Sequence, residues 1–340
     1  TLSMKKKHLG KIRKITKPIP EVYNSEPKQE GIRTINIKRD GQQGIVGVAH
    51  KTPAATHPDA PAFMVLSSIL SSGKNSRFYK NITDKGLTTS VYIWDSLFRD
   101  PGLFTVYANL SPDVDHKTAE KAVVDEYEKI KKDGVSDEEV KNAQTQLIAS
   151  MKFRQDGSYA IASGLNEAIA SGDWTLYTTY DEKIGTVTKE DVQRIVKEYF
   201  KEDLSTIGYF IPLGAGGQNK KLATSAKDLE KMKLKHYSEE EELLSSKVVD
   251  SEPVEGIRLL TLKRGSGVVT LTGSMLGGDI YASGNARTAD MVAAMLDQGT
   301  TNMTKFEISA KLESAGARLG FFSGQARVGF SGKFLSEDTK

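Results

Sequence analysis

The sequence predicts an α+β fold in which antiparallel sheets are each covered by helices on one face, with repeated units joined by a linker. Short strand patterns in adjacent hairpins alternate with longer helical patterns, which is typical of this class. A glycine-rich and then highly charged stretch at residues 214–255 indicates a linker. After it, residues 255–264 repeat six of the ten residues at 30–39, where the first strand pattern begins.

The composition limits the class of protein. A chain of 340 residues exceeds one typical domain, so two or three units are expected. No apolar run reaches the roughly 18 residues of a membrane-spanning helix. A net charge of +3 argues against a dedicated nucleic-acid binder, which normally carries a clearly basic domain. The absence of cysteine excludes disulfides, thiolate catalysis and cysteine-bound zinc.

The chain opens on a charged segment without an apolar core, which is not a secretory signal as it stands. We interpret it as the end of an amphipathic helix with Leu2 and Leu9 on one side, followed by a proline-bearing connector to residue 30. The sequence stops at Lys340, just after an apolar stretch. Both ends therefore indicate a fragment of a longer protein.

The first unit is predicted over residues 1–213. Alternating side chains predict strands over 32–38, 44–50, 87–94, 103–110 and 204–212. Asp59 is expected to cap an apolar helix that ends at Gly73, and a short helix follows from Ser76. Further helices are predicted over 119–130 and 158–171, and from the capping residues Ser136 and Thr188.

The second unit is predicted over residues 256–340. It begins with a strand near Gly256, and a second strand pattern covers 268–275. Helices are expected over 288–298 and 306–314, and strand-like segments lie between 318 and 334.

Metal chemistry would have to use the five histidines or carboxylates. His50 and His57 flank Pro53, with Asp59 near, so a ligand cluster is conceivable. The better interpretation is a strand-to-helix turn at 57–59. The other histidines fall on charged helices or in the linker and are interpreted as solvated: His8, His116 and His236. Neither the direct nor the inverted zinc-helix motif occurs.

No other catalytic pattern is present. The glycine-rich segment 214–221 lacks the spacing and the Gly-Lys-Ser/Thr ending of a phosphate-binding loop. No Gly-x-Ser-x-Gly elbow supplies an activated hydroxyl. The acidic runs at 137–139 and 239–242 lie where helix starts and a solvated linker place charges. From its residues alone, the chain shows no active site.

Several segments together resemble the pitrilysin/insulinase family of zinc metallopeptidases. Their order and spacing match the second subdomain of a family half over about residues 1–213: 52–59 with the apolar helix to Gly73, 76–79, 85–92, 100–104, 135–139 and 187–192. The resemblance implies two homologous halves, each of two α+β subdomains, that close around a chamber for peptides. It also implies a zinc held by His-x-x-Glu-His on the first helix of the catalytic half.

Residues 256–340 resemble the beginning of a second half. On that alignment Asp290, Ala293 and Ala294 stand where an active half carries His, Glu and His. Alanine neither binds zinc nor accepts a proton, so this half is expected to be non-catalytic. Thr83 and Thr89 stand near where non-catalytic halves place an arginine and a tyrosine that hold substrate. The first half is therefore expected to bear the zinc, on a helix upstream of Thr1.

The sequence thus predicts the central, non-zinc-binding portion of a zinc-dependent endopeptidase, which forms the chamber wall and the hinge. No catalytic, cofactor or metal residue is assigned to this chain, which is predicted to be inactive alone, and zinc is expected in the full-length parent. The expected partners are a peptide or unfolded polypeptide substrate and the zinc-bearing subdomain, with no nucleic acid and no membrane span.

Two alternatives stay open. One is a catalytically inactive family member that serves as a scaffold or partner subunit, and the other is a peptide-binding module that uses an exposed sheet edge. The lack of cysteine suits a bacterial envelope and a reducing cytosol equally. The resemblance favours a periplasmic location.

Overall fold

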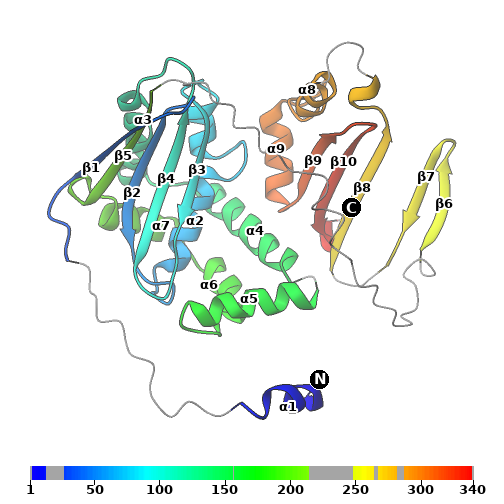
Figure 1. Cartoon of the computed structure of the whole chain (residues 1–340), viewed down its shortest axis with the longest axis horizontal. Helices are drawn as coiled ribbons and strands as arrows, with labels where there is room; N and C mark the ends of the chain where they lie inside the picture. Colours follow the sequence, from blue (N-terminus) through cyan, green and yellow to red (C-terminus); the bar gives the residue numbers. More distant parts are fainter. Residues whose placement is uncertain are drawn as a thin grey trace. The chain divides into compact units, whose positions relative to one another are not determined.

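The computed structural model describes residues 2–12, 27–155, 157–213, 248–263, 267–281 and 287–338 (Figure 1). Residues 1–30 and residues 31–340 form two separate units. The first contains the predicted opening helix, α1 (Leu2–Leu9). The glycine-rich segment 214–221, the acidic run 239–242 and His236 lie outside the described residues.

Residues 31–213 are built on a five-stranded sheet with the order β1-β5-β2-β4-β3. Each strand lies within two residues of its prediction: β1 (Arg33–Arg39), β2 (Ile45–Thr52), β3 (Thr88–Asp95), β4 (Gly102–Leu110) and β5 (Ser205–Pro212). Four strands pair antiparallel, whereas β1 runs parallel to β5. β1 departs from the predicted antiparallel pairing because its neighbour in the sheet is β5 and not β2, the next strand in the chain.

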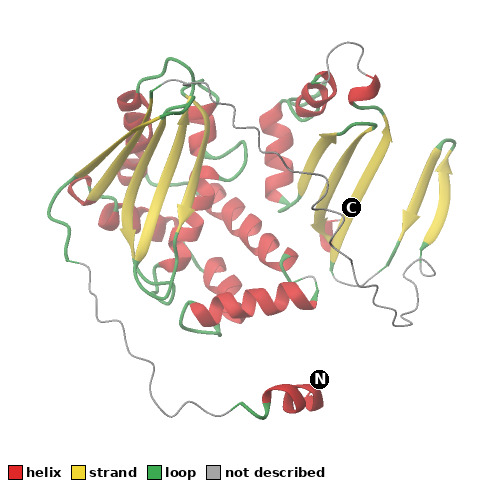
Figure 2. Ribbon diagram, in the orientation of Figure 1, coloured by secondary structure: helices red, strands yellow, loops and turns green. Residues whose placement is uncertain are grey.

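Helices cover one face of this sheet, as predicted (Figure 2). Burial alternates along β2 and β4, so that Val46, Val48, Phe104 and Val106 face the helices. Three helices supply the other side of the core: α2 (Ala60–Ser71), α3 (His116–Asp133) and α7 (Lys189–Tyr199). The α+β class with helices on one face is therefore confirmed for this part.

The remaining helices of this part begin largely where capping chemistry predicts. Capping boxes at Ser136 and Thr188 start α4 (Asp137–Phe153) and α7. The short helix after Ser76 includes a π-helical turn, η1 (Tyr79–Thr83). α5 (Ser158–Ala170) was predicted, whereas α6 (Leu176–Gly185) was not.

The prediction that Asp59 caps α2 is wrong in its chemistry. Asp59 occupies the N-cap position, but its backbone is already helical and its side chain makes no capping hydrogen bond. Arg194 and Tyr199 of α7 instead donate to the carboxylate, so Asp59 joins two helices rather than closing one.

Residues 248–338 contain a hairpin and a second sheet. β6 (Val249–Val254) pairs antiparallel with β7 (Ile257–Thr261) across Gly256, whose φ of +80° suits a glycine turn. β6 therefore forms a strand inside the stretch predicted as linker. The second sheet has the order β8 (Val268–Leu276), β10 (Arg327–Leu335), β9 (Arg318–Ser323), and is accompanied by α8 (Thr288–Met295) and α9 (Lys305–Ser314).

Candidate functional site

His50 and His57, the two histidines considered for a metal cluster, lie in different environments. His50 lies in the core, with its ring 5.6 Å from that of Tyr127 and 4.9 Å from that of Phe200. Burial, assisted by the charge of Lys131, lowers the pKa of His50 to about 4, so its imidazole is neutral. His57 lies in the predicted strand-to-helix turn, where its Nδ1 accepts the Asp59 N–H at 3.1 Å. Among the described residues, no three His, Asp or Glu side chains are placed to hold a metal ion.

The expectation that His116 is solvated is wrong. His116 is the first residue of α3 and is half-buried. Its Nε2 lies 2.8 Å from the carbonyl oxygen of Phe210, and its ring meets that of Tyr209 edge-on at 5.9 Å. A charged helix therefore still places its histidine against the sheet. His8 is exposed, as expected.

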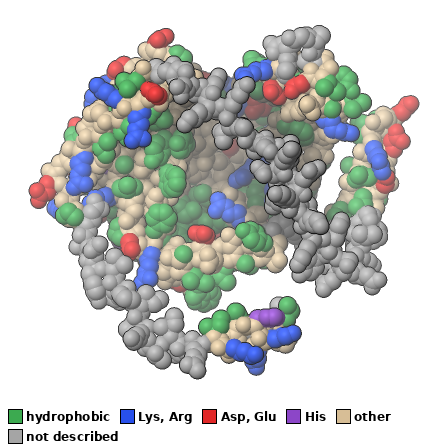
Figure 3. All heavy atoms as spheres, viewed as in Figure 1, with side chains coloured by type: hydrophobic (Ala, Val, Ile, Leu, Met, Phe, Trp, Pro, Cys, Tyr) green, Lys and Arg blue, Asp and Glu red, His purple; other side chains and the backbone are tan. Residues whose placement is uncertain are grey.

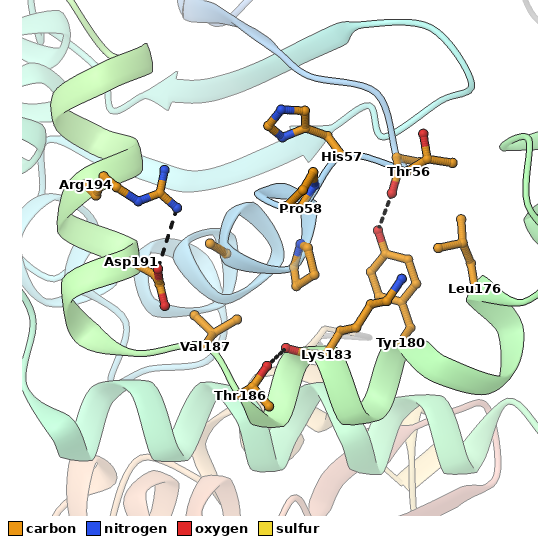
Figure 4. A pocket seen from close by; sticks show the side chains of 13 residues that line it. Thr56, His57, Pro58, Leu176, Tyr180, Lys183, Thr186, Val187, Asp191 and Arg194 are labelled. Carbon is orange, nitrogen blue, oxygen red and sulfur yellow. Dashed lines mark hydrogen bonds and ion pairs between the residues drawn. The ribbon is translucent and has the colours of Figure 1, made fainter.

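A cavity of about 330 Å³ lies between the loop after β2, the end of α6 and the side of α7 (Figure 4). Polar side chains line it from three elements: His57, Tyr180, Lys183, Asp191 and Arg194. Its hydrogen-bonding groups are largely engaged with one another. The Tyr180 hydroxyl donates to the carbonyl of Ala55 at 3.0 Å, and Arg194 reaches Asp191 at 3.6 Å.

Arg194 and Tyr199 hold Asp59 next to this cavity. Arg194 Nη2 lies 2.6 Å and the Tyr199 hydroxyl 2.9 Å from the carboxylate oxygens. Hydrogen bonding from Arg194 holds the pKa of Asp59 below its ordinary value. A carboxylate so engaged is a poor proton acceptor. We therefore assign Asp59, Arg194 and Tyr199 to a structural clamp between α2 and α7, not to catalysis.

The positions that the resemblance aligns with functional residues carry no catalytic arrangement. Thr83 Oγ1 lies 3.1 Å from Thr88 Oγ1, and Thr89 accepts a hydrogen bond from Gln43 at 2.6 Å. On α8, Ala293 is buried, whereas Asp290 and Ala294 are exposed.

The uncovered face of the first sheet is rich in apolar side chains (Figure 3). Residues on alternate positions of β1, β3 and β4 share this face and are 44–59% exposed: Ile35, Ile37, Tyr92, Trp94 and Leu103. The rings of Tyr92 and Tyr107 stack across β3 and β4 at 5.2 Å. We call this set the uncovered sheet face. The alternation of the strands in the sequence predicts that such a face exists, but not its apolar character.

Asp95 is the residue of greatest chemical interest that sequence reasoning missed. It is the last residue of β3, and both its carboxylate oxygens are buried without a hydrogen-bond partner among the described residues. Burial raises the pKa of Asp95 to about 7. A signal was present in the sequence, because Asp95 continues the inward alternation of Val91 and Ile93.

The second part of the chain contacts the first through α9 and the loop before it. Lys74 forms an ion pair with Asp297 at 2.9 Å, and the Asn75 amide donates to the carbonyl of Phe306 at 3.1 Å. The ring of Phe306 meets Tyr79 edge-on at 6.4 Å. These contacts join residues that are more than 200 positions apart in the sequence.

Known proteins resemble this chain in sequence and in fold. A family model described as the peptidase M16 inactive domain matches residues 1–147. The zinc protease PqqE of Helicobacter pylori is 28% identical over 212 residues, which cover 62% of this chain and 48% of that protein. An uncharacterized zinc protease of Streptomyces coelicolor, SCO5738, is 30% identical over 176 residues, or 51% of this chain and 38% of that protein.

The solved structures include a protease from Helicobacter pylori with a TM-score of 0.59 and 27% identity, covering 62% of this chain and 52% of that one. The chain thus spans about half or less of the length of these relatives. Among the described residues, every helix is too short or too polar to span a lipid bilayer. Residues 1–147 thus match the peptidase M16 inactive domain, and the chain is similar in sequence and fold to proteins named zinc proteases, in agreement with the family resemblance of its sequence.

Proposed function

We propose that this chain is the central, non-zinc-binding portion of a zinc-dependent endopeptidase. The observation that carries the proposal is the match of residues 1–147 to an inactive domain, in a chain that covers only 48% of the similar zinc protease PqqE. The zinc and the water it activates would then belong to another subdomain of the whole protein. This chain would supply a rigid wall against which that subdomain closes.

The proposed division is residues 1–213 as the second subdomain of the first half, 214–255 as the linker between halves, and 256–340 as the start of a non-catalytic second half. Two observations support it. β5 lies between β1 and β2, so the first sheet is complete only at residue 212. Ala293 and Ala294 offer no metal ligand on the helix that aligns with the zinc helix.

The uncovered sheet face is the proposed chamber wall. It presents aromatic and aliphatic side chains that are 44–59% exposed, and burial of such surface is the general source of affinity for unfolded polypeptide. In the whole protein, Tyr92→Ser should raise KM for a peptide substrate by about fivefold, since roughly 1 kcal/mol of apolar contact is lost. Tyr159→Ser, at an 87% exposed tyrosine on α5, is the matched control and should leave KM unchanged.

Zinc content tests the central proposal. The whole protein, purified without a metal column, should hold about one zinc per chain and hydrolyse a quenched fluorescent peptide. The 340-residue chain, purified beside it, should do neither. Zinc-dependent turnover by the 340-residue chain itself would refute the assignment. Absence of zinc from both would favour the scaffold or partner-subunit alternative, with catalysis residing in another chain.

We also propose a periplasmic location for the whole protein, on the family resemblance alone. Osmotic-shock fractionation of the source bacterium, with a cytoplasmic and a periplasmic marker enzyme measured in each fraction, tests it. Recovery of the protein with the cytoplasmic marker would overturn the proposal.

A further inference from the structure

A second cavity, of about 580 Å³, lies where the end of β3 and the loop after it meet α2, α4, α5 and α6. Its walls are mainly apolar and include Met64, Leu147 and Met151. Phe98 and Tyr177 add aromatic rings, and Phe98 is 60% exposed. A cavity of this size, apolar with a few polar groups, has the general character of a small-ligand site.

Two polar side chains in the lining have no partner among the described residues. Both carboxylate oxygens of Asp95 are buried and unpaired, and so is the hydroxyl oxygen of Ser68, a residue only 6% exposed. Buried polar groups in proteins nearly always have a hydrogen-bond partner, and an unpaired carboxylate is costly. The cavity therefore lacks a component that forms hydrogen bonds with these two groups.

The neighbouring groups do not supply that component. The Tyr180 hydroxyl lies in the same lining but donates to the carbonyl of Ala55. Arg154 is exposed, and burial alone accounts for the raised pKa of Asp95, so no guanidinium offsets its charge. The other ionisable groups in the lining include two more carboxylates, Glu167 of α5 and Asp181 of α6. Both of these carboxylates are exposed, so the buried, unpaired carboxylate of Asp95 is the group that favours a cation in the cavity.

We propose that this cavity binds an organic cation, an ammonium or guanidinium group on an apolar body, with Asp95 as its counter-ion and Ser68 as a second acceptor. The cation would donate to the carboxylate in a charge-assisted hydrogen bond, while the aromatic rings favour positive charge at their faces. A single water is a weaker explanation, because it fills only about 30 Å³. The chemistry is shared by the basic side chain of a peptide and by a free small amine.

Calorimetric titration of the 340-residue chain tests this site without reference to peptidase activity. The probes are phenethylamine, a free amine, and Nα-acetyl-lysine methylamide, a peptide-like lysine, with 2-phenylethanol as the neutral comparison. The cations should bind about tenfold or more tightly than the alcohol. The cation that binds more tightly shows whether the ligand is a free amine or a lysine side chain of a peptide, and the proposed site is supported in either case. Failure of both cations to bind would overturn it.

Variants assign the binding to Asp95. Asp95→Asn should weaken binding of the cations by about tenfold or more and leave 2-phenylethanol unaffected. Asp181→Asn is the matched control, because it makes the same change at an exposed carboxylate in the same lining and should retain most of the affinity. Equal affinity of the unaltered chain and Asp95→Asn for the cations would refute the proposal.

The pH profile gives a second readout that needs no variant. At a pKa of about 7, the ionised fraction of Asp95 rises from about a tenth at pH 6 to about nine tenths at pH 8. Affinity for a cation should rise about tenfold over this range, whereas affinity for the alcohol should not change. Burial raises the pKa of Tyr180 to about 12, so its hydroxyl stays neutral over this range; the other ionisable groups of the lining are Arg154, Glu167, Tyr177 and Asp181. A flat profile for the cations would contradict the assignment of Asp95 as counter-ion.

Discussion

Replacing Asp95 by asparagine should stabilise the protein at alkaline pH and not at acidic pH. The carboxylate of Asp95 is buried without a donor, so its ionised form is disfavoured by the fold. Asparagine has nearly the same shape and cannot ionise. The substitution therefore removes the cost of burying a charge and leaves the surrounding contacts of β3 and α6 in place.

The size of the effect follows from the pKa of Asp95, which burial raises from 3.8 to about 7. Each pH unit corresponds to 1.36 kcal/mol, so the ionised form costs the folded state about 4 kcal/mol. Between about pH 4 and pH 7 the folded chain binds more protons at Asp95 than the unfolded chain does. Its contribution to the free energy of unfolding therefore falls as pH rises through this window, and is flat above it.

Urea unfolding at pH 4.5, 6 and 8, followed by circular dichroism, provides the assay. The difference in unfolding free energy between Asp95→Asn and the unaltered chain should grow by about 3–4 kcal/mol from the lowest to the highest pH. A constant offset from the unpaired amide does not affect this slope. Asp181→Asn, at an exposed position, should show no such slope. A difference that is independent of pH would show that Asp95 ionises freely in the fold and would refute the reasoning.

Three further outcomes are expected. Arg77→Lys should lower the free energy of unfolding by about 1–3 kcal/mol in urea titration. Arg77 donates to both oxygens of Glu139 at 2.6 and 2.9 Å, and lysine cannot form this pair of hydrogen bonds. An unchanged urea midpoint would contradict this prediction. Tyr199→Phe should cost about 1 kcal/mol by loss of the hydrogen bond to Asp59, and a gain in stability would argue against the clamp. Removing ten residues from the 214–255 linker of the whole protein should lower turnover more than thermal stability, whereas unchanged turnover would count against a hinge.

Most elements of the fold follow from local patterns in the sequence. Alternation in 44–50 and 103–110 located β2 and β4 because each strand has one covered and one uncovered face. Ser136 and Thr188 located helix starts because their capping boxes are satisfied by residues three positions away. α6 was missed since it begins without a capping side chain, and its position depends on contacts with distant residues, such as those of Leu176 and Ile184 with the core.

Features that depend on distant residues could not be predicted in this way. The parallel pairing of β1 with β5 joins residues more than 170 positions apart, and nothing within 32–38 distinguishes it from antiparallel pairing. Asp59 occupies a capping position, but Arg194 and Tyr199 compete for its carboxylate from 135 and 140 positions away. The local sequence pattern therefore predicts the position of Asp59 at the start of α2 correctly, but not the residues that bind its carboxylate.

Asp59 and Asp95 show why the second cavity, rather than the first, is the better candidate for ligand binding. Both are aspartates next to a cavity at the end of a strand or at the start of a helix. Arg194 and Tyr199 satisfy Asp59 and lower its pKa, so the fold itself uses that carboxylate. Nothing in the described chain satisfies Asp95, and the fold is less stable for containing it. A side chain that contributes to stability is explained by the fold alone, whereas one that diminishes stability needs a partner from outside, and the chemistry of an unpaired carboxylate makes that partner a cation.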